Sequence, residues 1–201
     1  MSALALLLVT VTAPQPAFAA APDKPAAPAQ VVITAELACL HCDFGEGESC
    51  AVCLKLDDKT PVRLAGKAAK QFEELRLDKK VLVAEGTLSV GKDKRLVLTS
   101  DKAHLYTDKD KGKVPEKGQA LVVGVGCCGK CDLDLCDECT LAVRNDKQPI
   151  VLDGKLATQH AEEGKGGRKV TATGKLFVDK RGLLRLDAKA VKLDKADKQE
   201  K

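Results

Sequence analysis

The feature that most constrains the fold of this 201-residue chain is an internal repeat. The segment CLHCDFGEGESCAVCLKL (39–56) resembles CGKCDLDLCDECTLAV (128–143), and GKAAKQFEEL (66–75) resembles GKLATQHAEE (154–163). Further along, the following residues keep one register between the copies: Gly66/Gly154, Gly86/Gly174, Leu88/Leu176, Val90/Val178, Leu96/Leu184, Leu98/Leu186 and Leu105/Leu193. A chain with only two copies must bury a core in each of them, so we predict a tandem pair of domains and not a solenoid.

Composition marks the boundaries of these domains. We place the first repeat at 30–108 and the second at 118–194. The segment 109–117 between them is charged and contains Pro and Gly, which is typical of a solvated linker. The Pro/Ala-rich segment 20–29 and the charged tail 195–201 are interpreted in the same way.

The N-terminal segment has the pattern of a signal peptide. Residues 1–19, MSALALLLVTVTAPQPAFA, carry an apolar run at 3–11 and end in Ala-Phe-Ala, which fits the small-x-small rule for signal peptidase. We therefore expect cleavage before Ala20 and a mature protein that is periplasmic or secreted. No later segment is apolar enough to predict a membrane-spanning helix.

Each repeat is predicted to be a small β-barrel. In the first copy, strand-like segments occur at 31–37, 51–56, 61–64, 81–90 and 95–100, whereas 67–75 has helical spacing. Five strands with a helix after the third are the order of an OB-fold, and Gly86 or Gly174 in strand four suits the bend of a closed barrel. We predict a mainly β protein with two tandem OB-like five-stranded barrels, each with one short helix after strand three and a four-cysteine loop between strands one and two. A flat α+β sandwich is the alternative architecture.

The cysteines predict two metal sites. They form two Cys-x-x-Cys pairs in each repeat, and we match the members of the first set to those of the second in chain order: Cys39, Cys42, Cys50 and Cys53 with Cys128, Cys131, Cys136 and Cys139. Four thiolates satisfy tetrahedral Zn²⁺, so all eight are predicted metal ligands. Iron and copper use the same thiols, and the pattern does not exclude them. Cys127 has no counterpart, because Ala38 takes its place in the first repeat.

Two other interpretations of the cysteines stay open. Disulfides between Cys39 or Cys42 and Cys50 or Cys53 would suit a small exported domain with few aromatic residues. A thiol redox protein is the third interpretation, but the loops are rich in carboxylates, which raise thiol pKa values, and neither pair begins a helix of a βαβ unit. The sequence therefore favours a non-catalytic metal-binding protein with a structural or metal-handling role, and a disulfide-stapled envelope interaction module is the alternative.

Charge and composition bear on the partners. The net charge of +4 is dispersed along the chain and aromatic residues make up only 2%, so the sequence predicts that nucleic acid is not a partner. A metal ion is the expected partner, with an envelope protein as a second candidate. No catalytic triad, phosphate-binding loop or framed carboxylate pair occurs, so an enzyme is not indicated.

The combination of signal peptide, strand, two cysteine pairs and a Gly-Lys helix–strand tail resembles a family of small exported bacterial domains of uncharacterised function with an OB-like core, here duplicated. The resemblance covers both repeats and rests mostly on cysteines and glycines. It implies the fold more than an activity.

Overall fold

The structure, a computed structural model, describes residues 27–145, 148–164 and 166–194, and within them the protein is mainly β. The predicted signal peptide and the predicted C-terminal tail lie outside the described residues, as does most of the segment 20–29. The first half of the fold consists of β1 (Gln30–Cys39), α1 (Leu40–Phe44), β2 (Val52–Asp57), β3 (Thr60–Ala65), α2 (Lys67–Phe72), β4 (Val81–Val90) and β5 (Leu96–Leu105).

The strands of this first half close into a five-stranded barrel. Strand β1 pairs with β2, β2 with β3, β3 with β5 in parallel, β5 with β4, and β4 with β1 again. This closed order, with a helix between β3 and β4, is the OB topology that the strand pattern predicts. A flat sandwich does not describe this half, because the sheet closes on itself.

The second half follows a short 3₁₀ helix, η1 (Asp108–Asp110). Its elements are β6 (Gln119–Cys128), β7 (Leu141–Val143), β8 (Ile150–Asp153), α3 (Lys155–Gln159), α4 (Ala161–Gly164), β9 (Lys169–Val178) and β10 (Leu184–Leu193). Strand β6 pairs with β7, β7 with β8, β8 with β10 in parallel, β10 with β9, and β9 with β6.

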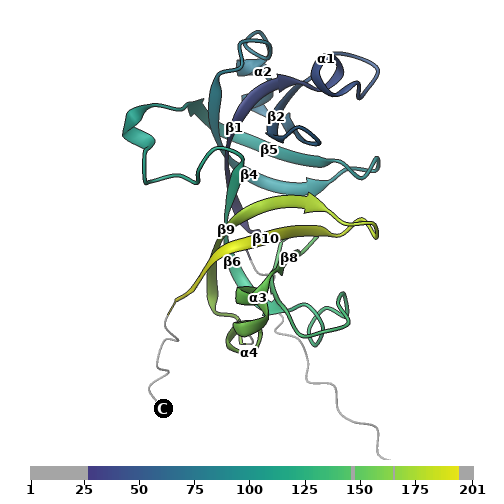
Figure 1. The fold of residues 1–201 in the computed structure, drawn as a ribbon, viewed down its shortest axis with the longest axis vertical. Coiled ribbons are helices and arrows are strands. Elements are labelled where there is room, and N and C mark those ends of the chain that lie inside the picture. Colours follow the sequence, from purple (N-terminus) through teal and green to yellow (C-terminus); the bar gives the residue numbers. More distant parts are fainter. Residues whose placement is uncertain (1–26, 146–147, 165, 195–201) are drawn as a thin grey trace, which may run out of the picture.

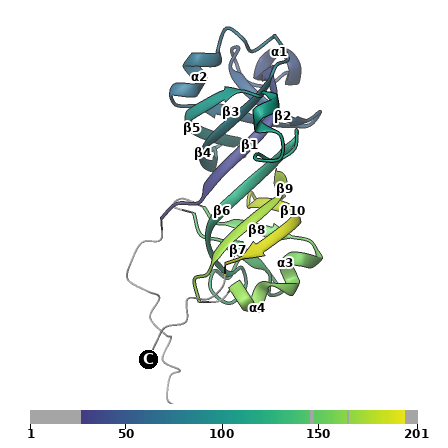
Figure 2. The same cartoon turned by 90° about the vertical axis from the view of Figure 1, so that its left-hand side faces the viewer.

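The two halves are joined through their first strands. Residues 30–34 of β1 run antiparallel to 119–123 of β6, which makes one ten-stranded sheet. Figures 1 and 2 show β1 and β6 side by side at the middle of the molecule, with α1 and α2 at one end and α3 and α4 at the other. The buried aliphatic residues of both halves form one continuous cluster that crosses this junction.

The glycine in strand four of each half lies where the backbone of strand five approaches closely. Gly86 sits at a register shift between β4 and β5, and a Cβ there would overlap the carbonyl oxygen of Thr99. Gly174 in β9 has the same relation to Asp187. Only a residue without a side chain allows the neighbouring backbone to approach this closely.

The segment predicted as a solvated linker, 109–117, is packed against the first half. Pro115 is buried, and the Lys117 ammonium lies 2.7 Å from the Glu36 carboxylate. Directly after it, the Gly118 amide donates a hydrogen bond of 2.7 Å to the Thr34 carbonyl. These contacts lead the chain from β5 into its pairing with β1.

Candidate metal centres

Both cysteine loops begin where the first strand of a half ends. Cys39 is the last residue of β1, and the five-residue helix α1 follows it and stops at Gly45, whose φ is +65°. Cys128 is the last residue of β6, and Asp134 takes the left-handed φ of +52° at the position that matches Gly45. The two loops therefore reverse direction at the same point.

An aspartate fixes the start of each loop. The Asp43 carboxylate accepts a hydrogen bond of 2.7 Å from the backbone N–H of Cys39, and Asp132 accepts one of the same length from Cys128. Each bond runs four residues back along the chain and holds the loop over its first cysteine. Carboxylates form strong bonds of this kind because the acceptor is charged.

An arginine from the hairpin that closes each half holds the middle of each loop. The Arg95 guanidinium lies 3.0 Å from the Glu46 carboxylate, and the Arg181 guanidinium donates a hydrogen bond of 2.9 Å to the carbonyl of Leu135. Glu46 and Leu135 are matching residues of the two loops. The turn between strands four and five therefore anchors the cysteine loop in both halves.

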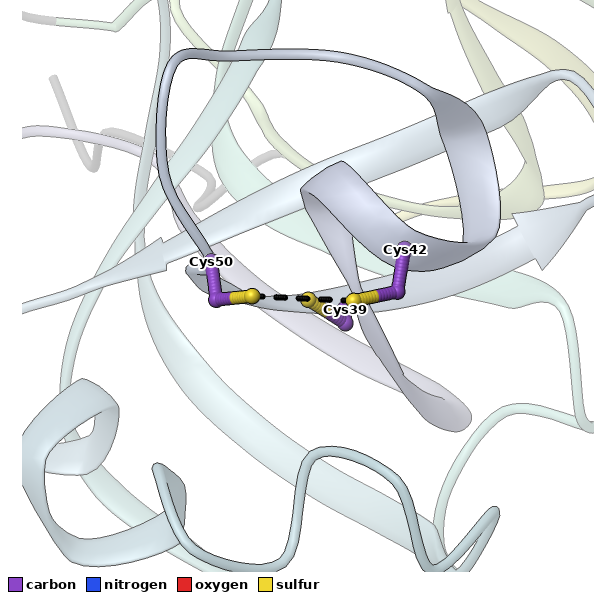
Figure 3. Close-up of side chains that lie close together, drawn as sticks. All are labelled: Cys39, Cys42 and Cys50. Carbon is purple, nitrogen blue, oxygen red and sulfur yellow. Dashed lines mark hydrogen bonds between the residues drawn. The ribbon is translucent and has the colours of Figure 1, made fainter.

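The first loop brings three thiols together: Cys39, Cys42 and Cys50, called here the first cluster. Their sulfur atoms all lie within 4.8 Å of one another, and the Sγ atoms of Cys42 and Cys50 are 3.6 Å apart (Figure 3). Cys39 is buried, whereas Cys42 and Cys50 are exposed. The cluster is therefore open to solvent on one side and could hold a metal ion.

The second loop has an equivalent second cluster of Cys128, Cys131 and Cys139. These sulfur atoms also lie within 4.8 Å of one another, and the Sγ atoms of Cys131 and Cys139 are 3.5 Å apart. The backbone N–H of Cys131 points at the Cys128 sulfur at 3.4 Å. Cys128 is buried and Cys131 is exposed, as in the first cluster.

The electrostatics of both clusters favour one ionised thiol, the buried one. Burial opposes ionisation of Cys39, but hydrogen bonds from the Cys42 and His41 backbone and from neighbouring thiols outweigh it and lower the pKa of Cys39 to about 7. The pKa of Cys128 is lowered by the same balance. Hydrogen bonds with Cys39 and Cys50 raise the pKa of Cys42 to about 11, so Cys42 keeps its proton until a cation replaces it.

The other two predicted ligands, Cys53 and Cys136, lie outside the clusters. Cys53 is buried in β2, its thiol donates to the carbonyl of Ala38 at 3.4 Å, and burial raises its pKa to about 12. Cys136 is half-buried, and burial raises its pKa as well. The structure brings six of the eight predicted ligands together and leaves these two apart.

The structure also matches the cysteines differently from chain order. Cys50 corresponds to Cys139, so both clusters have the spacing C-x2-C-x7-C, and Cys53 corresponds to Ala142. A shared Asp directly after the second cysteine, together with the equal spacing, was the sequence signal for this match. The loops therefore have the same length up to the third cysteine.

Two buried cysteines lie at equivalent pairs of facing residues in the two halves, but on opposite strands of the pair. Cys53 of β2 pairs with Ala38 of β1, and Cys127 of β6 pairs with Ala142 of β7. The thiol of Cys127 lies 3.6 Å from the Ala142 carbonyl, and burial raises its pKa to about 11. Each half thus has one Cys/Ala pair between its first two strands, so Cys53 and Cys127 have a packing role.

Comparison with solved structures gives structural neighbours but no relative that assigns a family. No family model and no curated protein matches the chain. A solved structure of a deletion mutant of the single-stranded DNA binding protein from Thermus aquaticus matches with a TM-score of 0.45 and 17% identity, over 84% of this chain and 95% of that chain. At this level of similarity the match assigns no ligand to this chain.

This match corrects one prediction made from the sequence. We expected that nucleic acid is not a partner, and a single-stranded DNA binding protein among the structural matches contradicts that exclusion. The exclusion rested on scarce aromatic residues and dispersed charge, which describe composition and not the surface that a fold presents.

Among the described residues, no helix has both the length and the apolar character needed to span a bilayer.

Proposed function

We propose that the chain is an exported protein of two tandem OB-like barrels, 30–108 and 118–194, and that each barrel binds one soft metal ion such as Zn²⁺ at its three-cysteine cluster. The observation that carries this proposal is the recurrence of the same three-thiol arrangement, with the same spacing, in both halves. The signal-like segment 1–19 supports export to the periplasm or the medium.

The distances between sulfur atoms support a metal in preference to unrelated free thiols. Thiolates at about 2.3 Å from a tetrahedral Zn²⁺ lie about 3.8 Å from one another. The Sγ separations of 3.6 Å for Cys42 and Cys50 and 3.5 Å for Cys131 and Cys139 are close to that value. A shared cation would also replace the protons that Cys42 and Cys131 otherwise keep.

The supporting residues have the features of a prepared site. Asp43 and Asp132 hold the backbone of the buried cysteines, and Arg95 and Arg181 hold the loops between the second and third cysteines. Residues that orient ligands in this way raise metal affinity. Three protein ligands leave one coordination position of the ion free for a further ligand.

Metal analysis of the full chain, purified without chelator and under argon, tests the proposal. We expect about two ions per chain, and about one after Cys42→Ser or Cys131→Ser. The control is Cys53→Ala, which places in the first half the residue that Ala142 already provides at the matching position. Equal metal content in all three variants would contradict the proposal.

A second candidate function is favoured by the same short distances. Oxidation would convert the pairs Cys42/Cys50 and Cys131/Cys139 into disulfides, because their sulfur atoms already lie 3.6 Å and 3.5 Å apart. The chain would then be a disulfide-stapled interaction module. Thiol counting by mass spectrometry after alkylation separates the two functions, since the disulfide form has four fewer free thiols and no metal.

A further inference from the structure

The two cysteine loops differ at one pair of contacting residues. In the first loop the buried side chain of Leu40 reaches toward Gly47, where a Cβ would lie 3.8 Å from the Leu40 Cδ2 atom. In the second loop the matching residues are Gly129 and Cys136, and a Cβ on Gly129 would lie 3.1 Å from the Cys136 sulfur. The same contact exists in both loops, but in the second loop a thiol provides it.

This exchange places a fourth sulfur beside the second cluster. Gly129 follows the buried ligand Cys128 directly, so the Cys136 thiol packs against the backbone of the metal loop. Cys136 also lines a cavity of about 310 Å³ together with the ligand Cys139. Cys136 therefore lies next to two residues of the second loop, Gly129 and Cys139.

Cys136 differs from the other two cysteines that lie outside the clusters. Cys53 and Cys127 are fixed within β-strands, are at most 1% exposed, and direct their thiols at strand carbonyls. Cys136 lies between β6 and β7 in a segment that has no strand pairing, and its side chain is partly exposed. A rotation of its side chain toward the cluster breaks no hydrogen bond of the sheet.

We propose that the two metal sites have different coordination: in the second, Cys136 joins Cys128, Cys131 and Cys139 as a fourth thiolate and closes the site, whereas the first keeps three thiolates and an open position. This inference rests on the proposed function. A closed four-thiolate site is the arrangement of structural zinc, and three protein ligands with one open position are the arrangement of sites that bind a further ligand. The second site is therefore the structural one, whereas the ion of the first has a position for a further ligand.

Cobalt titration of full-length single-site proteins tests this assignment. Cys42→Ser leaves only the second site, and Cys131→Ser leaves only the first. The second site is expected to bind Co²⁺ about tenfold or more tightly than the first, with stronger sulfur-to-cobalt charge-transfer absorption because it has one more thiolate. Added Cys136→Ala is expected to reduce both quantities to the values of the first site.

The control is Cys53→Ala in the Cys131→Ser protein, which should leave Co²⁺ affinity and the spectrum of the first site unchanged. Circular dichroism and the melting temperature of Cys136→Ser, compared with Cys136→Ala, separate loss of a ligand from loss of packing. If Cys136→Ala leaves the affinity and spectrum of the second site unchanged, Cys136 is a packing residue and the inference is wrong while the proposed function stands. Failure of every variant to bind Co²⁺ would overturn the proposed function and the inference together.

Discussion

Replacing Asp43 with Ala tests whether the aspartate that follows each Cys-x-x-Cys pair prepares the metal loop. The variant removes a charge-assisted hydrogen bond of 2.7 Å to the Cys39 amide. Such bonds contribute about 1.5–3 kcal/mol. Because the Asp43 side chain is exposed and screened by water, we take the lower end, about 1.5 kcal/mol. In a chain of this size that loss lowers the melting temperature by about 3–6 °C.

The effect on metal binding is expected to be local. Loss of a residue that orients ligands reduces affinity about 10–100-fold. Co²⁺ titration of Asp43→Ala in the Cys131→Ser background should show this loss, because only the first site remains there. Asp43→Asn keeps an oxygen acceptor without the charge and should cause about half of the loss in stability, since neutral hydrogen bonds contribute about 0.5–1.5 kcal/mol.

The matched control is Asp58→Ala. Asp58 is also a loop aspartate of the first half and lies 2.7 Å from the Lys55 ammonium, but its side chain is 89% exposed. A surface ion pair of this kind contributes about 0–1 kcal/mol to the free energy of unfolding. It involves no cysteine. If Asp43→Ala and Asp58→Ala have the same Co²⁺ affinity and melting temperature, the aspartate does not prepare the site and the reasoning is refuted.

Three further predictions follow from the same structure. In the metal-free Cys128→Ser protein, the thiolate absorbance should rise with a midpoint near pH 7, because the folded state lowers the Cys39 pKa from 9.0 to about 7. The stability that this ionised thiol contributes is complete above pH 9 and is lost as the pH falls through 7, and persistence of the step after Cys39→Ser is added to that protein would contradict this. Gly174→Ala should cost about 1–3 kcal/mol in urea unfolding, because the new methyl group overlaps the Asp187 carbonyl, and an unchanged midpoint would show that strand four does not need its glycine. A fragment of residues 30–108 should fold alone, with dispersed amide resonances, but associate through the free edge of β1, and collapsed dispersion would mean that the halves depend on each other.

The strands could be predicted where the apolar pattern was uninterrupted. The segment 81–90 is β4 with the same bounds, and 31–37 lies within β1. Strand β5 extends to Leu105, beyond the predicted end at residue 100, because Asp101 and Lys102 interrupt the apolar pattern, although Lys102 and the residues after it still pair with β4. The pattern of apolar side chains does not show which strands pair through their backbone groups. For the same reason the pairing of β1 with β6 was not predicted.

The sequence predicted the cysteines that form the two clusters, but it did not show which of the eight predicted ligands lie outside them. The sequence identified all six clustered cysteines, because the Cys-x-x-Cys spacing is visible in a single chain. It also included Cys53, although that residue falls inside the predicted strand 51–56, where alternate side chains face the core. The position of Cys136 beside Gly129 depends on how the loop folds back on itself, which the spacing does not encode.

The main-chain pairing of β1 with β6 makes the hydrogen bonds of the junction independent of the exact apolar residues that flank them. Backbone N–H and C=O groups form this ladder, so an exchange of one apolar side chain for another of similar size at residues 30–34 or 119–123 leaves it in place. Proline is the exception, because it has no N–H to donate. The sequences of the two halves can therefore drift apart, including at Leu40 and Gly129, while the relative orientation of the halves is retained.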